Sequence, residues 1–456
     1  MILKIKSIIK KNYLLLLITL LFLMLGFDSK KDLTPFDPAK REEIQYVTVG
    51  DSIDYNIDYF KSLYDFNQVE MHEESYLLSG NIESSIYTLS IRKEETNQFF
   101  YMNHRKDIIS KKQGVAKLSV SFYKDEDFVE SIDLGLFVIL NDLTMDDTWV
   151  GLNSTNFYDE INKNPNGRFY IESDIFLDSR ANIDYFSGTL LNPNQHIISI
   201  DLLSYDWYNQ GLFKTLEGAY IDGLIIKNAT MKPTTFNRIE TLSMGFLAAY
   251  AGNSMISNVS VEGNILSDAN SSAEVVGGIV GVSYGSIYRH VSFVGSIQGD
   301  FNQIGGLIGF ARFDYRVSSS GLQYSVLNYD MIDGAYVIAD IDSNKDYISY
   351  QVRGFIGNFF DQYTSIRHGY FDGSIDSIEV YDDFPFFKDS FSRYRVSYLY
   401  STLGPLQEYR ERYTFDLDEY KEISQEELKS GESLLGLSMF IFNDNEYPLL
   451  SYWRLP

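Results

Sequence analysis

The chain of 456 residues contains no cysteine, only five histidines and few basic side chains. The absence of cysteine excludes disulfides, thiolate metal sites, iron–sulfur clusters and a cysteine nucleophile. The sequence has 38 Lys and Arg residues and 63 Asp and Glu residues, which gives a net charge of −25. Because phosphate backbones and anionic lipids bind through Lys and Arg, this balance disfavours both, and we expect no nucleic-acid partner.

The length and apolar content are sufficient for a large folded core. At about 100–200 residues per domain, the chain is long enough for two to four domains. Hydrophobic residues make up 45% of the sequence, which excludes disorder throughout. Runs with helical periodicity are scarce between the apolar segments, so we expect an all-β fold.

Residues 1–27 have the three parts of a secretory signal. A basic group, Lys4 to Lys11, precedes an apolar run from Tyr13 to Phe27, and polar residues follow. The run is just shorter than the roughly 17–25 residues that span a bilayer, yet Gly26 is the only small residue near a cleavage point. A cleaved signal peptide and a retained signal-anchor therefore both stay open.

In either case the lysines before the apolar run place the body of the chain outside the cell. We expect an extracellular or cell-surface protein that meets the membrane only through this segment, if the segment is not cleaved. Residues 28–43 are polar and contain Pro35 and Pro38, which predicts a linker.

Residues 44–142 contain short runs in which apolar and polar residues alternate. The clearest is Ala116-Lys-Leu-Ser-Val-Ser-Phe122, whose period of two places one face in a core and the other in water. Several such runs in about 100 residues predict a β-sandwich. The segment from Gly114 to Phe122 also resembles the late strands of bacterial immunoglobulin-like domains, which implies an immunoglobulin-like sandwich here.

A self-similar series fills residues 152–415. Its clearest copies are Gly277-Gly-Ile-Val-Gly, Gly305-Gly-Leu-Ile-Gly and Arg353-Gly-Phe-Ile-Gly. When the copies are aligned on the glycine before the apolar pair, most intervals are about 30 residues, the range of solenoid repeats. That alignment uses Gly211, Gly245, Gly278, Gly306 and Gly354. The last interval is longer, and we expect a degenerate copy within it, around Tyr336–Asp340.

Each copy is too short to bury its own apolar face, so neighbouring copies must stack. Glycine pairs allow the chain to turn, and two or three apolar β-formers follow and face inward. Short strands that turn at glycine and repeat without helices predict a right-handed parallel β-helix.

These residues resemble the GLUG-motif repeats of bacterial surface proteins. The best match is Gly277-Gly-Ile-Val-Gly-Val-Ser-Tyr-Gly-Ser-Ile, and the lead-in Phe169-Tyr-Ile-Glu-Ser-Asp-Ile also fits. Relatives of this kind include the region that precedes the catalytic domain of immunoglobulin A protease-like metallopeptidases. The resemblance implies a bacterial β-helix protein at the cell surface.

Residues 416–456 are expected to form a small helical cap of the solenoid. Ser424-Gln-Glu-Glu427 has the spacing of a capping box, in which Ser424 and Glu427 each accept a hydrogen bond from the other's amide. The closing segment Glu446-Tyr-Pro-Leu-Leu-Ser-Tyr-Trp453 resembles the terminal strand of such solenoids.

Catalytic motifs are weak throughout. The segment His72-Glu-Glu-Ser-Tyr76 begins like a zincin motif but has Tyr76 where the second zinc ligand belongs. Gly281-Val-Ser-Tyr-Gly285 matches the nucleophile-elbow pattern, but a strand-like run follows in place of the helix that an elbow needs. We therefore expect Ser283 to lie in a solenoid turn, and we expect neither a catalytic residue nor an organic cofactor.

One acidic run has the oxygen spacing of a calcium loop: Asp340, Asp342, Asn344 and Asp346. An EF-hand would have glycine at the sixth position and glutamate at the twelfth, where this chain has Lys345 and Gln351. Calcium at these four residues stays a candidate beside an ordinary acidic surface turn.

Together these features predict a non-enzymatic cell-surface protein, structural or adhesin-like. Its β-helix would present a rigid surface to a glycan, an extracellular protein or a cell-envelope partner. Two alternatives stay open: a carbohydrate-active β-helix enzyme, a polysaccharide lyase or glycosidase, and the scaffold remnant of a surface metallopeptidase.

Overall fold

The structure, a computed structural model, describes residues from Ile44 to Leu450 with gaps. The expected signal (1–27) and linker (28–43) lie outside the described residues. The described residues are 44–53, 65–72, 75–82, 85–92, 99–102, 108–124, 127–177, 183–200, 209–233, 241–267, 273–312, 330–343, 351–359, 364–377, 395–403, 420–431, 434, 437, 440–442 and 446–450.

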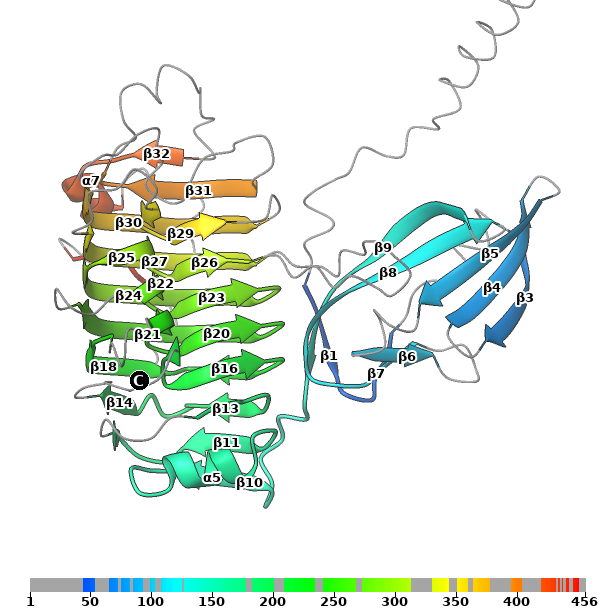
Figure 1. The fold of residues 1–456 in the computed structure, drawn as a ribbon, viewed down its shortest axis with the longest axis horizontal. Coiled ribbons are helices and arrows are strands. Elements are labelled where there is room, and N and C mark those ends of the chain that lie inside the picture. Colours follow the sequence, from blue (N-terminus) through cyan, green and yellow to red (C-terminus); the bar gives the residue numbers. More distant parts are fainter. Residues whose placement is uncertain are drawn as a thin grey trace, which may run out of the picture. The chain divides into compact units, whose positions relative to one another are not determined.

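The N-terminal module consists of two β-sheets (Figure 1). The larger has the order β1-β9-β8-β5-β4-β3 and the smaller β2-β7-β6. Between the two sheets, Phe100 of β6 and Phe137 of β9 pack edge to face, with ring centroids 5.6 Å apart. The larger sheet is formed by β1 (Ile44–Thr48), β3 (Asp65–His72), β4 (Ser75–Ile82), β5 (Ser85–Arg92), β8 (Gly114–Lys124) and β9 (Asp127–Leu140). The smaller is formed by β2 (Ser52–Ile53), β6 (Phe100–Met102) and β7 (Ile108–Ser110).

The predicted strands of this module are present, including the alternating run in β8. An immunoglobulin-like sandwich is not confirmed. Strands β3, β4, β5, β8 and β9 pair antiparallel in one sheet, and the facing sheet has strands of only two or three residues.

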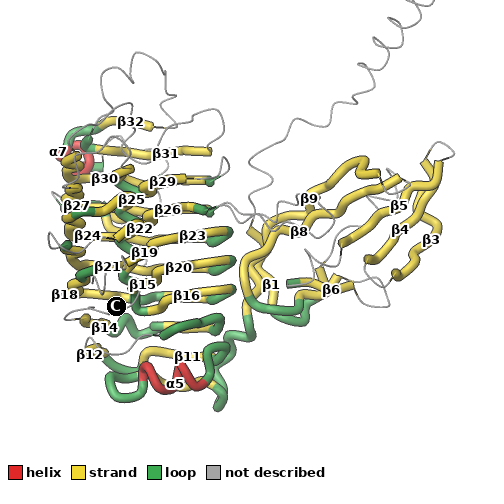
Figure 2. Tube along the Cα trace, viewed as in Figure 1, coloured by secondary structure: helices red, strands yellow, loops and turns green. Residues whose placement is uncertain are grey.

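Parallel sheets form a solenoid from Trp149 to Glu422, which confirms the expected parallel β-solenoid (Figures 1 and 2). The chain passes in turn through two five-stranded sheets and one wide sheet. The first five-stranded sheet contains β15 (Asn209–Gln210), β19 (Thr241–Gly245), β22 (Ala273–Gly277), β25 (Phe301–Gly305) and β28 (Gln351–Arg353). The second contains β16 (Phe213–Glu217), β20 (Ala248–Gly252), β23 (Val280–Tyr284), β26 (Ile308–Ala311) and β29 (Ile356–Phe359).

The wide sheet has 13 strands. Its long strands β21, β24, β27 and β30 supply most of the outer surface considered below. The strands are β10 (Trp149–Leu152), β11 (Arg168–Ile171), β12 (Ile175–Leu177), β13 (Thr189–Leu191), β14 (Ile197–Ile200), β17 (Tyr220–Asp222), β18 (Ile225–Met231), β21 (Met255–Leu266), β24 (Ile287–Gly299), β27 (Met331–Ser343), β30 (Ser365–Ser377), β31 (Arg395–Ser401) and β32 (Tyr420–Glu422).

One apolar core runs through the stack from Leu152 to Tyr420. We call each passage of the chain through the three sheets a rung. The inward side chains of successive rungs pack together; for example, the rings of Phe186 and Phe213 stack with centroids 5.2 Å apart. At the N-terminal end, helix α5 (Phe157–Lys163) closes the core by burying Phe157 and Ile161. This helix was not among the expected elements, although its two buried residues have helical spacing.

The repeat alignment was wrong by one residue from its third copy onward. The strand register pairs Gly245 with Gly277, so that Phe246 aligns with Gly278. The physical reason is that large and small residues change places between opposite walls of the core. Phe246 is the large residue in one rung, and in the next rung Phe293 is large where residue 278 is glycine. A Cβ atom on Gly278 would lie 2.5 Å from Cγ of Phe293, and Phe246 and Phe293 stack at 6.4 Å on successive rungs.

The expected degenerate copy at Tyr336–Asp340 is also wrong. Those residues belong to β27, which pairs with β24 before it and β30 after it. The long interval is therefore a single rung, with residues 313–329 inserted between β26 and β27.

The Gln113 side chain joins the N-terminal module to the solenoid. Its Nε2 donates to the carbonyl oxygens of Ser187, Gly188 and Gly218 at 3.3, 2.8 and 3.2 Å. Its Oε1 accepts from Thr189 Oγ1 at 2.7 Å. The amide of Val115 adds a bond to the Asn253 carbonyl at 2.7 Å, so the junction reaches several successive rungs.

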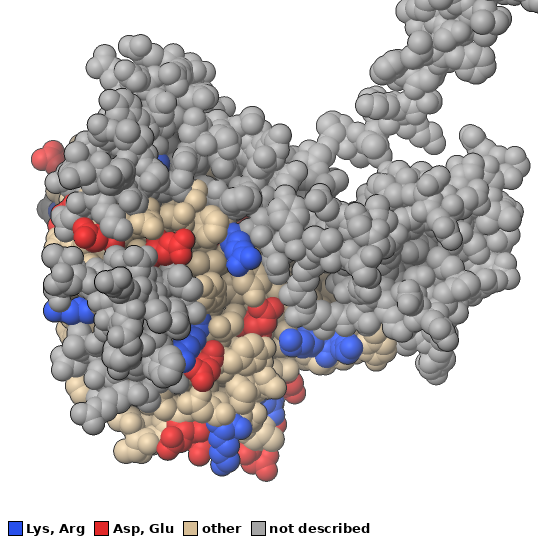
Figure 3. Space-filling model, viewed as in Figure 1, with Lys and Arg blue, Asp and Glu red and all other residues tan. Residues whose placement is uncertain are grey.

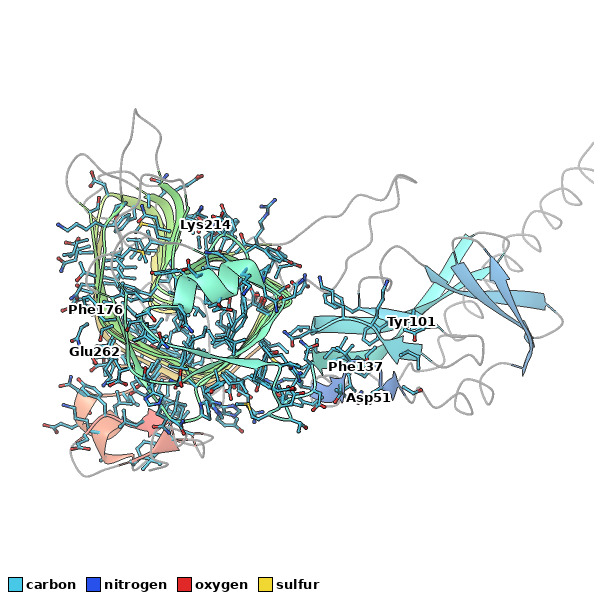
Figure 4. The ribbon with its side chains drawn as sticks, turned by 90° about the horizontal axis from the view of Figure 1, so that it is seen from below. Asp51, Tyr101, Phe137, Phe176, Lys214 and Glu262 are labelled. Atoms are coloured by element: carbon cyan, nitrogen blue, oxygen red, sulfur yellow. The ribbon has the colours of Figure 1, made fainter. Side chains whose placement is uncertain are left out.

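The C-terminal segment adds β32 to the last rung and then runs along the outside of the wide sheet. It contains α7 (Gln425–Ser430), β33 (Phe440–Ile441) and β34 (Leu449–Leu450). The predicted capping box is confirmed: Ser424 Oγ accepts from the Glu427 amide at 3.1 Å, and Glu427 Oε2 accepts from the Ser424 amide at 2.7 Å. Figure 4, which looks along the stack, shows these elements outside the solenoid wall.

Substitution of Gly277 tests the turn that defines the repeat. A Cβ atom there would lie 1.9 Å from the Val280 carbonyl oxygen, and backbone cannot move aside as a flexible side chain can. We expect Gly277→Ala to cost about 3 kcal/mol of stability. Thermal unfolding followed by circular dichroism should show the midpoint lowered by about 5 °C. The control Gln298→Ala, an exposed position on β24, should leave the midpoint nearly unchanged.

Candidate functional site

A corner in each long strand of the wide sheet determines which side chains face outward. One residue per rung adopts a left-handed conformation there, with φ between 52° and 74°: Asn258, His290, Gly334, His368 and Tyr398. Glycine and asparagine adopt this conformation readily, and histidine more often than most residues. Beyond the corner, residues alternate between the core and the outer surface.

Four outward columns follow from this alternation. The first begins with Ser260 and Ser292 and continues with tyrosines. The second has an acid at each end, in the order Glu262, Val294, Ile338 and Asp372. In the third, Asn264, Ser296, Asp340 and Ser374 lie on successive strands. In the fourth, Gln298 aligns with Asp342. Figure 4 shows Phe176 and Glu262 on this outer side of the sheet.

The third column is a row of hydrogen-bonded polar groups. Ser296 Oγ donates to Asn264 Oδ1 at 2.8 Å, and Ser374 Oγ donates to Asp340 Oδ1 at 2.7 Å. Three of these four residues are exposed and Ser296 is half-buried. Because parallel strands lie about 4.8 Å apart, the column presents hydroxyl, amide and carboxylate groups at a regular spacing. We call these four residues the polar column.

The predicted calcium residues are only partly described. Asp340 and Asp342 lie two residues apart on β27, so both face outward on the same surface. Asn344 and Asp346 lie outside the described residues. Across the described ranges, no group of three or more His, Cys, Asp or Glu side chains could hold a metal ion. Calcium binding here stays a prediction.

A second polar row lies along the corner. Asn258 Nδ2 donates to Asp222 Oδ1 at 2.7 Å, and Asn258 Oδ1 lies 3.0 Å from His290 Nδ1. Since the asparagine oxygen accepts, Nδ1 of His290 carries the hydrogen. Burial raises the pKa of Asp222, against hydrogen bonds from Asn258 and Ser257.

His290 is held neutral by its surroundings. Burial lowers its pKa below the ordinary value of 6.5, and the Arg289 charge acts in the same direction while Asp333 opposes it. Two rungs along, His368 Nδ1 lies 2.7 Å from Asp333 Oδ1, and its ring stacks on Tyr398 at 5.3 Å. The corner row thus aligns imidazole, amide and carboxylate groups, and the Asp333 carboxylate acts on both His290 and His368.

Ser283 lies in the core and not at a catalytic elbow. It is fully buried on β23, donates to Asp330 Oδ1 at 2.8 Å and accepts from the Tyr288 hydroxyl at 2.6 Å. The strand β24 follows it, as the sequence suggested. The Asp330 carboxylate also accepts from the Ser286 amide at 2.9 Å. This buried network satisfies backbone and hydroxyl groups at a turn.

The network extends an internal row of side-chain oxygens. The amide of Ala219 donates to Ser254 Oγ at 3.0 Å, and the amide of Ser254 donates to Ser286 Oγ at 3.2 Å. Asp330 occupies the next position of this row. Sequence reasoning missed Asp330, although the recurring serine after Gly285 was a usable signal.

The zincin-like segment lies on two strands of the N-terminal module. His72 ends β3 and Tyr76 follows the start of β4, where His72 pairs with Ser75. A zincin motif needs its residues on a helix, so this arrangement differs from the one that binds zinc.

On the visible face of the described solenoid, acidic and basic side chains are interspersed (Figure 3). Among the helices that the structure describes, none is both long and apolar enough to cross a membrane.

No protein-family model matches this chain, and a comparison with curated proteins gives no significant match.

The neutral state of His290 predicts a pH effect on stability. Because the pKa of His290 is lower in the folded chain than the 6.5 of the unfolded chain, the unfolded chain binds a proton more readily. The free energy of unfolding therefore falls as the pH drops below 6.5. We expect His290→Asn to reduce the loss of thermal stability between about pH 8 and about pH 5. Asparagine is the matched replacement because Asn258 occupies the same position one rung earlier. An identical pH dependence in both proteins would contradict this prediction.

The hydrogen bonds to the buried carboxylate of Asp330 predict that two substitutions of this residue reduce stability to different extents. Asp330→Ala leaves the Ser286 amide and the Ser283 hydroxyl without this acceptor and should cost about 2–3 kcal/mol. Asp330→Asn keeps an acceptor oxygen and should cost less. Thermal unfolding of the two variants measures the difference, and equal losses would show that the acceptor is unimportant.

Proposed function

We propose that this protein is an exported, non-enzymatic cell-surface element that uses its β-helix as a rigid binding scaffold. The observation that carries the proposal is the polar column. Four polar side chains face outward from successive strands of one sheet, and two hydrogen bonds link them in pairs. Preorganised hydroxyl, amide and carboxylate groups are suited to hydrogen-bond a polar polymer without reorganisation.

The partner we propose is a glycan of the cell envelope or extracellular matrix. A glycan offers hydroxyl groups at repeated intervals, which match a column whose groups also repeat. The acidic chain supports this choice over nucleic acid or an anionic lipid surface. In the same proposal, residues 1–27 direct or anchor the chain outside the cell, and the stack is a right-handed, GLUG-like β-helix.

A scaffold role is favoured over catalysis by the chemistry of the described residues. Ser283 is buried, and the carboxylates of Asp222 and Asp330 accept hydrogen bonds within the fold. A glycosidase would need two carboxyl groups about 5–10 Å apart on an accessible surface. Asp340 and Asp342 lie at about that separation on β27, so the assay for reducing ends, and not carboxylate spacing, decides between the two functions.

Binding to a glycan array tests the proposal. The full-length protein should bind a subset of glycans, and Asp340→Ala should reduce that binding about tenfold, the effect of one lost charge-assisted hydrogen bond with its partners. Asp159→Ala is the matched control, because Asp159 is exposed on α5, away from the polar column.

Repeating the array with and without calcium separates a metal-dependent site from direct binding. Failure of the wild-type protein to bind any glycan would overturn the proposal. Release of reducing ends from a bound polysaccharide would replace it with the enzymatic alternative.

A further inference from the structure

Three tyrosines lie along the first outward column of the wide sheet. Tyr336, Tyr370 and Tyr400 are register partners on β27, β30 and β31. The rings of Tyr336 and Tyr370 are parallel to within 5°, with centroids 5.2 Å apart. Although they point away from the solenoid core, all three are almost completely buried. Something outside the sheet therefore covers them.

The cover consists of the described residues of the C-terminal segment between Ser424 and Leu450, which we call the strap. Phe440 lies against both Tyr336 and Tyr370, with ring centroids 6.4 and 5.7 Å away. The strap and the tyrosine column form one apolar cluster that is separate from the solenoid core. The buried strap residues in this cluster are Leu428, Leu437, Phe440 and Leu450.

Polar contacts fix the position of the strap. The Tyr370 hydroxyl donates to the Pro448 carbonyl oxygen at 2.7 Å. At the rim, Gln425 Nε2 donates to Asp372 Oδ2 at 3.0 Å. Within the strap itself, the ammonium group of Lys429 lies 4.5 Å from the centre of the Tyr447 ring. The two hydrogen bonds to Tyr370 and Asp372 hold the strap against the wide sheet.

Backbone hydrogen bonds contribute little to this attachment. Ile423, just before the strap, donates its amide to the Ser401 carbonyl at 2.9 Å. Within the described part of the strap, the main-chain bonds are local: they lie in α7, its turn and the short β33–β34 pair. A segment held mainly by side chains, with a six-residue helix and two-residue strands, opens more easily than a continuous parallel ladder.

We propose that the strap opens as a unit while the solenoid stays folded, and that the strap of a second copy can then occupy the tyrosine column. The second copy is the occupant because it carries the same side chains that already fit this surface. Exchange of an identical segment between copies needs no new interface chemistry.

Concentration controls the exchange. A tethered strap competes at an effective concentration on the order of millimolar, so a dilute protein stays closed. Dense packing of chains on a surface raises the local concentration of a neighbour's strap to the same millimolar range. This inference goes beyond the proposed function, which supplies only the setting in which copies would be crowded.

A labelled synthetic peptide with the sequence of residues 424–450 serves as the probe. We expect it to bind the full-length protein carrying Leu450→Ala about tenfold more tightly than the wild type, because that protein holds its own strap less firmly. Leu450 is fully buried against the column, whereas its neighbour Leu449 is 37% exposed. The matched variant Leu449→Ala should therefore bind the peptide as the wild type does.

The peptide itself supplies the second control. A peptide carrying Leu450→Ala should fail to bind any of the three proteins. Hydrogen exchange should show faster exchange in the strap of the Leu450→Ala protein and unchanged protection in β21, β24 and β27. Equal peptide binding to both variants, or loss of protection throughout the solenoid, would overturn the proposal. Neither readout uses a glycan, so failure of the proposed glycan binding would leave this test intact.

Discussion

Direct contact between backbones, where the two five-stranded sheets meet, is the constraint on which the solenoid depends. A Cβ atom on Gly281 would lie 2.8 Å from the Met244 backbone nitrogen, and one on Gly309 would lie 2.7 Å from the Val276 carbonyl carbon. Because these glycine positions have no room for a Cβ atom, the two five-stranded sheets stay close together. The apolar residues on either side then fill a narrow core.

The local part of this arrangement could be predicted from the sequence. Glycine pairs, apolar β-formers and alternating runs act over a few residues, so their spacing reveals the strands and the stacking. The exact rung register could not be predicted, since Phe246 in one rung and Phe293 in the next fill the core from opposite walls. The insertion at 313–329 misled the copy count for a related reason: a long connection leaves the register of β27 unchanged.

The candidate site was predictable only in part. Because side chains alternate along a strand, the sequence places Asp340 and Asp342 on one face. The residues near Asp340 in the sequence do not show that Ser374 lies beside it. The tyrosines of β27 and β30 have the apolar pattern of core residues, yet they face outward and are buried by a distant segment. Asp330 follows a long insertion, which hides its place in a row that otherwise consists of serines.

The junction at Gln113 has a mechanical consequence. Strands of the solenoid run across the stacking direction, so tension along the stack would peel rungs apart one after another. Gln113 holds Gly188 and Gly218 on successive rungs, and Val115 holds Asn253 on the next. A load entering through the N-terminal module is thereby divided among three rungs, and the end rung with α5 does not have to carry it alone.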